Sequence, residues 1–298
     1  MLFLARFILR GQSQAALVAA TMAILGLILP PAAWISAAAI VLVTLVHDPK
    51  SGLITLALSS VGAAIFSYLI FATPQVAVMF VLLAWLPAWL MASVLRQTVS
   101  LAYSLQILTI IGLFAVVVLY VLFPNFGEFW REPLDQIVVQ LAEQSSEFSL
   151  AELKQTEDWV IEFLPGLFVS SIMFGSMVSL FLGRWWQAVY YNPGGFAKEF
   201  QSLNLGKISA LVAATIMLIA SFVSSVFTIA LVTVVFILYG MQALSLVHAV
   251  INIRQVNSAW LVMIYLIMFF IPHVVLLLMF ASFVDPWLDI RKRIVKPV

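Results

Sequence analysis

The sequence predicts an all-α, polytopic transmembrane helix bundle of eight or nine spans with a short amphipathic helical insertion. Hydrophobic residues make up 64% of the 298 positions and charged residues only 9%, against about 25% charged residues in an ordinary soluble domain. The apolar stretches are continuous, which favours helices over the alternating strands of a membrane barrel. Stretches without a charged residue, such as 51–95 and 97–127, exceed the ~20 residues that one span needs.

The first 123 residues are predicted to form five spans after a short interfacial helix over residues 1–10. Prolines set the breaks, because proline cannot continue a helix. Pro30 and Pro31 end the first apolar stretch, and Pro74 divides the next one. The predicted spans cover residues 12–29, 32–46, 52–72, 75–95 and 101–123.

Residues 124–158 form the one substantial polar segment, which is predicted to be extramembrane. Apolar residues recur at helical spacing from Leu134 to Leu141 and predict an amphipathic helix. Ser149 and Glu152 have the spacing of a capping box, so a second short helix is predicted to begin there. The prediction is a helical hairpin on the membrane surface. The segment contains eight of the chain's 13 carboxylates: Glu128, Glu132, Asp135, Glu143, Glu147, Glu152, Glu157 and Asp158.

Residues 159–298 are predicted to form three or four spans, with a polar loop over residues 184–207. The stretch 208–253 is too long for one helix and is weakest at residues 221–225. Pro272 predicts a kink in the last span. The predicted spans cover residues 160–183, 208–222, 225–251 and 258–283.

Lysine and arginine in short loops predict the orientation, because these residues stay on the cytoplasmic side. A cytoplasmic N-terminus places most of them inside and the acidic segment outside. The N-terminus is therefore predicted to be cytoplasmic. Nine spans would leave the basic cluster Arg291, Lys292 and Arg293 outside, against the rule. Eight spans would bring it inside, if one short stretch is re-entrant or two segments form one tilted helix.

The most distinctive local sequence lies at residues 184–200, where aromatic residues surround an Asn-Pro-Gly-Gly turn. The segment either anchors a tight loop at the membrane interface, or it docks a partner or gates a ligand. Its candidate binding residues are Arg184, Trp185, Trp186, Gln187, Tyr191, Asn192, Pro193, Gly194, Gly195 and Phe196. We expect Arg184 to be free for a carboxylate or a lipid phosphate. We also expect Asn192 to bond its own backbone and Gly195 to need a positive φ.

A second candidate site is a polar set near the end of the 225–251 span, formed by Gln242, Ser245, His248 and Asn252. These residues fall within three helical turns, and Gln242, Ser245 and Asn252 share one face. Such a set would line the mid-membrane pocket of a small-molecule permease. Each histidine inside a span is either a functional group or a structural one that a single backbone carbonyl satisfies.

Small residues recur every four positions on two predicted spans, which lets helix backbones approach closely in lipid. The stripes are Ala15, Ala19 and Ala23 on one span, and Ser171, Gly175, Ser179 and Gly183 on the other. They predict packing inside one bundle, or a surface for a homodimer or a partner helix.

Several functions lack support in the sequence. The chain has no cysteine and three scattered histidines, so no metal site, cofactor or catalytic set is predicted, and an enzyme is not expected. A net charge of +1 does not indicate a basic surface that binds nucleic acid. The expected partner is the lipid bilayer. A cytoplasmic or membrane protein partner and a small-molecule ligand stay open.

Residues 184–200 resemble the signature of the YybS-like membrane proteins of bacteria, a family of unknown function, through Arg-Trp-Trp-Gln-Ala, Tyr-Asn-Pro-Gly-Gly-Phe and Glu-Phe. The segments 7–11, 95–96 and 284–291 resemble this family too, so the match covers essentially the whole chain. The family is distantly similar in helix layout to substrate-binding subunits of energy-coupling-factor transporters, which have fewer spans. The resemblance implies a permease or substrate-capture subunit, and it implies that the chain lies in a bacterial cytoplasmic (inner) membrane. The alternative is a membrane scaffold or assembly protein that docks a cytoplasmic partner through residues 184–200.

Overall fold

The computed structural model describes residues 2–144 and 149–294, so Glu147 of the acidic segment lies outside the described residues. Every regular element in these ranges is a helix, which confirms the all-α class. The first half contains α1 (Leu2–Ile8), α2 (Gln12–Gly26), α3 (Pro30–Val46), α4 (Pro49–Phe71), α5 (Gln75–Phe80), a π-helical turn (Val81–Trp85), α6 (Leu86–Thr98), α7 (Leu101–Leu122), a 3-10 turn (Phe126–Trp130) and α8 (Arg131–Gln144). The second half contains α9 (Leu150–Tyr191), α10 (Gly195–Gln201), α11 (Gly206–Val223), α12 (Val226–Ile253), α13 (Ala259–Phe270), α14 (Pro272–Leu288) and α15 (Ile290–Ile294).

Six helices of the described chain are long and apolar enough to cross a membrane: α4, the continuous α5–α6 unit, α7, α9, α11 and α12. The α13–α14 pair qualifies as a seventh only if it counts as one span, and it bends by 115°. The apolar helices α2 and α3 have 15 and 17 residues, which is below the ~20 residues of a typical span. The chain is thus a multi-pass helical membrane protein with six or seven helices of spanning length.

Proline and capping residues set several helix boundaries where the sequence predicts them. Pro30 begins α3, and the Asp48 side chain caps α4 by accepting a hydrogen bond from Ser51 N at 2.8 Å. This hydrogen bond lowers the pKa of Asp48. Ser225 caps α12 with a capping box, and this confirms the division of the long apolar stretch near residues 221–225.

The small-residue stripes pack inside the bundle. The alanine stripe on α2 is buried, and Ser36 Oγ on α3 donates a hydrogen bond to the Ala19 carbonyl at 2.6 Å. The stripe on α9 faces α3. A Cβ added to Gly183 would lie 2.5 Å from Val41 Cγ1, so only glycine permits this approach. The prediction of packing within one bundle therefore describes the alanine stripe and the α9 stripe from Gly175 to Gly183, whereas Ser171 is exposed.

Helix α9 is 42 residues long and differs from the prediction at both ends. It begins at the predicted Ser149 capping box but continues without a break into the membrane-spanning part, so the second arm of the expected hairpin is the start of this helix. It also continues to Tyr191, so the first eight residues of the expected 184–207 loop are helical. The prediction placed helix ends at the boundary between membrane and water. A helix can cross this boundary, because it ends only where a backbone break or a capping residue stops it.

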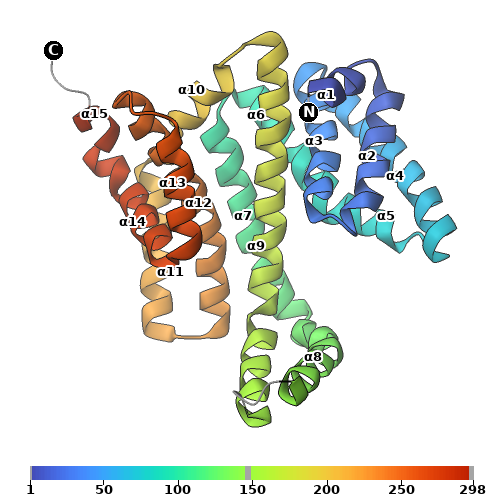
Figure 1. Ribbon diagram of the computed structural model, residues 1–298, viewed down its shortest axis with the longest axis vertical. Helices are drawn as coiled ribbons and strands as arrows, with labels where there is room; N and C mark the ends of the chain where they lie inside the picture. Colours follow the sequence, from blue (N-terminus) through green and yellow to red (C-terminus); the bar gives the residue numbers. More distant parts are fainter. Residues whose placement is uncertain (1, 145–148, 295–298) are drawn as a thin grey trace.

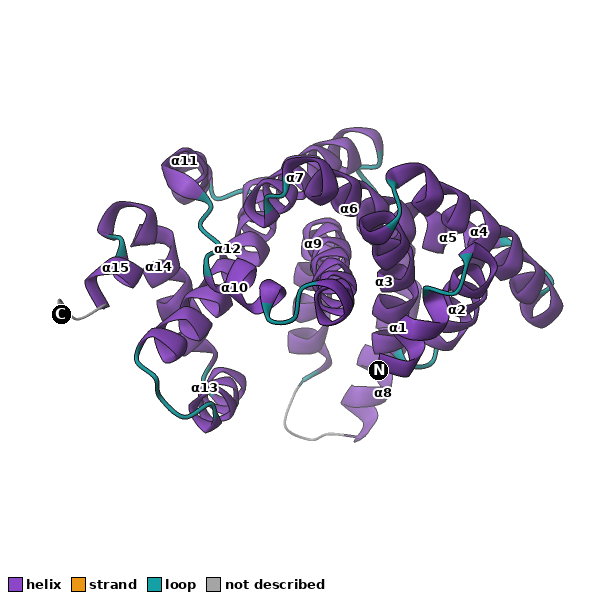
Figure 2. Cartoon of the chain, turned by 90° about the horizontal axis from the view of Figure 1, so that it is seen from above, coloured by secondary structure: helices purple, strands orange, loops and turns teal. Residues whose placement is uncertain are grey.

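The molecule is a bundle in which α9 stands between an N-terminal group, α2–α5, and a C-terminal group, α11–α15 (Figure 2). Figure 1 shows α1, α10 and α15 toward one end, which we call the terminal face, and α8 at the opposite end. The kink predicted at Pro272 is confirmed, because α13 and α14 meet there in a sharp bend. Both arms of this bend return toward the terminal face (Figure 1). His273 lies exposed at the bend.

Candidate functional site

An ion pair closes the short turn between α9 and α10. Arg184 Nε donates to Glu199 Oε2 at 2.9 Å, and Arg184 Nη2 pairs with the second oxygen of the same carboxylate. The Arg184 side chain is only 12% exposed. A planar guanidinium that meets both carboxylate oxygens is the stronger geometry for such a pair. Arg184, expected to be free for an external anion, is thus engaged inside the molecule.

The turn needs glycine at position 194 rather than at 195. Gly194 has a φ of +81°, in the left-handed region that favours glycine. Gly195 begins α10 and is restricted by space instead, because a Cβ there would lie 2.3 Å from Asn192 Nδ2. The positive φ that was predicted at Gly195 therefore occurs one residue earlier, at Gly194. Gly195 N donates to the Asn192 carbonyl at 2.9 Å and closes the turn.

The other predicted residues of this segment divide between core and surface. Trp186 is fully buried, whereas Trp185 and Tyr191 are exposed. Asn192 and Pro193 are also exposed. The Phe196 ring stacks on Phe200, with centroids 5.9 Å apart. The ten candidate residues therefore do not form one continuous surface.

A polar cavity of about 340 Å³ lies beside the ion pair, at the C-terminal end of α3. The Leu45 carbonyl there accepts hydrogen bonds from Arg96 Nη1 and from Gln187 Nε2, the latter at 3.1 Å. The last carbonyls of a helix lack helical partners and carry partial negative charge. Arg96 and Gln187 thus cap α3 and join it to α6 and α9.

The predicted intramembrane polar set is split by the structure. Gln242 and Ser245 are fully buried; Ser245 bonds the end of α10, and Gln242 bonds the segment between α10 and α11. Gln242 Oε1 accepts from Leu205 N at 2.9 Å, and Gln242 Nε2 donates to the Ser282 carbonyl at 2.5 Å. Ser245 Oγ donates to the Phe200 carbonyl at 2.6 Å. Both side chains therefore act as connectors between α10, α12 and α14.

Arg291 of α15 completes this network. Its Nη1 pairs with Asp285 Oδ2 at 2.5 Å, and its Nη2 donates to the Leu203 carbonyl at 2.9 Å and to Ser245 Oγ at 3.0 Å. Asp285 is only 1% exposed. Burial lowers the pKa of Arg291, and the Asp285 carboxylate opposes this effect. The basic C-terminal segment is thus fixed to the terminal face of the bundle.

His248 and Asn252 lie apart from Gln242 and Ser245. They line a separate cavity of about 240 Å³ near the end of α12. A His248 ring nitrogen lies 2.6 Å from the Tyr265 hydroxyl of α13, so its partner is a hydroxyl rather than the expected backbone carbonyl. Asn252 is exposed. The four predicted residues therefore do not meet in one pocket.

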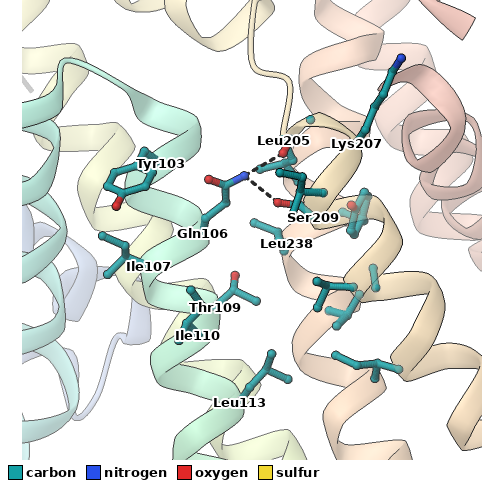
Figure 3. Close-up of a pocket in the computed structure, with 17 residues that line it drawn as sticks. Tyr103, Gln106, Ile107, Thr109, Ile110, Leu113, Leu205, Lys207, Ser209 and Leu238 are labelled. Atoms are coloured by element: carbon teal, nitrogen blue, oxygen red, sulfur yellow. Dashed lines mark hydrogen bonds between the residues drawn. The ribbon is translucent and has the colours of Figure 1, made fainter. Parts of the chain in front are cut away.

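A larger cavity, of about 460 Å³, lies between α7 and α11, with α12 behind it. We call it the α7–α11 groove. At its polar end, Gln106 Nε2 of α7 donates to the Leu205 carbonyl at 2.7 Å and to Ser209 Oγ of α11 at 2.6 Å (Figure 3). Lys207 lies at the same end and points away from the groove (Figure 3).

Below Gln106 the walls of the groove are apolar and open sideways. Ile110 of α7 and Val212 of α11 line it and are 64% and 51% exposed. In the outer surface of a membrane bundle, such side chains face lipid. From Tyr103 to Leu113, the groove extends over eleven residues of α7, whose ends lie about 15 Å apart at the helical rise. This length is about half of the ~30 Å hydrocarbon core, the depth of one leaflet.

Tyr239 of α12 lines the groove and is the most unusual polar residue there. It is 3% exposed, and its hydroxyl has no hydrogen-bond partner among the described residues. Its ring packs edge-on against Phe283 of α14, with centroids 5.5 Å apart. Tyr239 also borders a second cavity of about 260 Å³ on the α14 side. A buried hydroxyl without a partner carries a desolvation cost.

Sequence reasoning did not select the groove residues. Gln106 is the most polar residue of its span, and a polar side chain in lipid normally bonds a neighbouring helix. Tyr239 lies well inside its span, although tyrosine is enriched at membrane interfaces. These two signals were present in the sequence. The distance of 103 residues between Gln106 and Ser209 hid their contact.

Comparison of the chain with protein-family models, curated proteins and solved structures finds no match. The resemblance to the YybS-like family therefore stays a prediction that rests on the residues quoted for it.

Proposed function

We propose that this chain is a substrate-capture or permease component of the bacterial cytoplasmic membrane, and that it binds a single-chain amphiphile in the α7–α11 groove. The observation that carries the proposal is the groove itself. It has a volume typical of ligand pockets, apolar walls that open toward lipid, and hydrogen-bonding groups at one end. A ligand with one polar end and one alkyl chain would place its polar end at the hydrogen-bonding groups and its alkyl chain along the apolar walls.

The groove favours a ligand that enters sideways from the bilayer over one that crosses from water. A water-soluble substrate needs free polar groups near mid-membrane. Gln242 and Ser245, the predicted groups of that kind, are occupied by backbone partners. The docking alternative has less support for a similar reason, because Arg184 and Trp186 of the 184–200 segment are engaged internally.

We further propose eight crossings, a re-entrant α13–α14 hairpin and a cytoplasmic terminal face. In this arrangement the short helices α2 and α3 each cross, and both chain ends lie inside. Of the described lysines and arginines, Arg131 and Lys154 alone lie at the α8 end, with the acidic segment. The re-entrant hairpin brings the basic C-terminal cluster inside and so satisfies the charge rule. The groove then opens toward the inner leaflet.

The test is to fill the groove. Val212→Trp places an indole in the groove from a half-exposed position, whereas Leu211→Trp changes an equally exposed neighbour that does not line it. Both variants are purified in detergent and irradiated with a long-chain alkyl diazirine. We expect Val212→Trp to lower photolabelling several-fold and Leu211→Trp to leave it unchanged. Equal labelling of the two variants would show that the groove is not the binding site.

A further inference from the structure

The polar cavity of about 340 Å³ beside α10 brings hydrogen-bond donors from two helices together. Arg96 of α6 and Gln187 of α9 both donate to the Leu45 carbonyl, and all three residues line the cavity. The ends of these two side chains therefore converge on one point of the cavity wall. Arg184 also lines the cavity and precedes Gln187 by three residues, so both lie on the same face of α9.

The cavity has an excess of positive charge. Its charged lining residues are Arg96, Arg184 and Glu199, so two guanidiniums face one carboxylate. Arg184 engages that carboxylate, and no acidic side chain of the described chain forms an ion pair with Arg96. Hydrogen bonds from Ser51 lower the pKa of Asp48, and Arg96 adds a smaller effect. The Asp48 carboxylate is thus occupied in the cap of α4 and leaves the Arg96 charge unpaired.

Arg96 has donors to spare for a further group. A guanidinium carries five N–H groups, and within the described residues Arg96 bonds through Nη1 alone, to the Leu45 carbonyl. Arg96 is exposed, so its remaining N–H groups are accessible from outside the bundle. Two adjacent N–H groups of one guanidinium match two oxygens of a phosphoryl group.

The cavity lies at the level where membrane-spanning helices end. Leu45 belongs to the last turn of α3 and Arg96 to the last turn of α6. Leu95 and Val99 give the cavity an apolar side, and Val99 is 82% exposed. Lipid headgroups occupy this level of a membrane, and basic pockets between spanning helices bind them. A guanidinium beside an exposed apolar residue fits a lipid phosphate and the glycerol next to it.

We propose that this cavity binds a phosphoryl group, and that Arg96 holds two of its oxygens beside the Arg184–Glu199 ion pair. The phosphoryl group belongs either to a lipid headgroup or to free phosphate, and the exposed Val99 favours the lipid. The site is separate from the α7–α11 groove and does not depend on the function proposed for that groove.

The test compares two arginines that lie away from the α8 end of the molecule. Arg96→Gln removes the proposed contact, whereas Arg96→Lys keeps the charge and a donor for the Leu45 carbonyl but not the paired N–H groups. Arg254→Gln is the matched control, because Arg254 is exposed at the end of α12 and does not line the cavity. Val212→Trp blocks the α7–α11 groove and so identifies lipid that binds there instead.

Each purified protein is titrated in detergent with phosphatidylglycerol, with diacylglycerol of the same chains, and with inorganic phosphate. The unfolding temperature reports binding, because a ligand of the folded state raises it. Each variant is compared with itself without ligand, so a loss of stability from the substitution does not affect the result. Native mass spectrometry counts the bound lipid.

We expect phosphatidylglycerol to stabilise the native protein, Arg254→Gln and Val212→Trp to the same degree. Arg96→Gln should bind it about tenfold more weakly or worse, the size of a hydrogen bond to a charged group. Arg96→Lys should lose part of the affinity. Diacylglycerol should show no dependence on Arg96. An Arg96-dependent shift with inorganic phosphate, and no larger shift with phosphatidylglycerol, would support the site and assign it to free phosphate.

Four results would overturn the proposal. The first is the absence of an Arg96-dependent shift with either phosphate compound. The second is an equal loss of affinity in Arg254→Gln, because the effect would then be one of general surface charge. The third is native affinity in Arg96→Lys, which would contradict the two-point contact. The fourth is a loss in Val212→Trp but not in Arg96→Gln, which would place the lipid in the α7–α11 groove.

Discussion

Arg184 on α9 and Glu199 on α10 lie 15 residues apart and form a two-point ion pair across the Asn-Pro-Gly-Gly turn. Because lysine cannot meet both carboxylate oxygens, Arg184→Lys should destabilise the protein nearly as much as Arg184→Gln. The expected loss is about 2 kcal/mol, the size of a charged hydrogen bond, measured by thermal unfolding in detergent. Lys198→Gln on the exposed side of α10 is the control. Native stability of Arg184→Lys would show that the pair acts only as a point charge.

The two glycines of the turn should respond differently to substitution. Gly194→Ala places a Cβ at a φ of +81° and should cost about 1–2 kcal/mol. Gly195→Ala meets only the Asn192 side chain, which is exposed and can rotate away. We therefore expect the smaller loss at Gly195, and none in the Asn192→Ala background. Thermal unfolding of the native protein, the three single variants and the double variant measures this order, and the reverse order would contradict the geometry of the turn.

Asp285 and Asp289 provide a matched comparison of buried and exposed ion pairs. Asp285→Asn leaves Arg291 without its charge partner in a largely buried site and should cost about 3–5 kcal/mol. Asp289→Asn affects an exposed pair with Lys292 and should change stability by less than ~1 kcal/mol. Chemical or thermal unfolding of both variants tests the difference. Similar losses would mean that Asp285 is not shielded as the structure shows.

Single introduced cysteines can test the proposed topology without background labelling, because the native chain contains no cysteine. Glu143→Cys, Asn257→Cys and Lys292→Cys place thiols on α8, between α12 and α13, and on α15. An impermeant maleimide should label only the first in intact cells and all three after permeabilisation. Labelling at position 292 in intact cells would make α13–α14 a full crossing. Labelling at 257 but not at 143 would reverse the orientation.

Local chemistry in the sequence predicted many helix boundaries. Pro30, Pro272 and the capping box at Ser149 act within one or two turns of the chain, so their effects can be predicted without a structure. The break near residues 221–225 was predicted from the length of the apolar stretch, and the structure adds the capping box at Ser225. The continuous course of α9 was missed because the change from water to lipid alters composition without ending a helix.

The candidate site depends on contacts between distant segments. Gln106 meets Ser209, and Gln242 meets Leu205, only after α7, α11 and α12 have packed together. Sequence reasoning selected Gln242 and Ser245 as residues that line a mid-membrane pocket, but it could not show that backbone groups already satisfy them. The groove is likewise a product of packing, since α7 and α11 diverge below the bond between Gln106 and Ser209 (Figure 3).

Mapping the residues that an acyl diazirine probe labels tests the central claim most directly. The protein is irradiated with the probe in lipid nanodiscs, and the adducts are located by peptide mass spectrometry. The account predicts adducts concentrated at groove-lining positions of α7 and α11, such as Ile110 and Val212, and few at more exposed positions elsewhere, such as Leu69 of α4 and Phe269 of α13. Equal labelling of all four positions would contradict it, because the groove would then be no different from the rest of the lipid-facing surface.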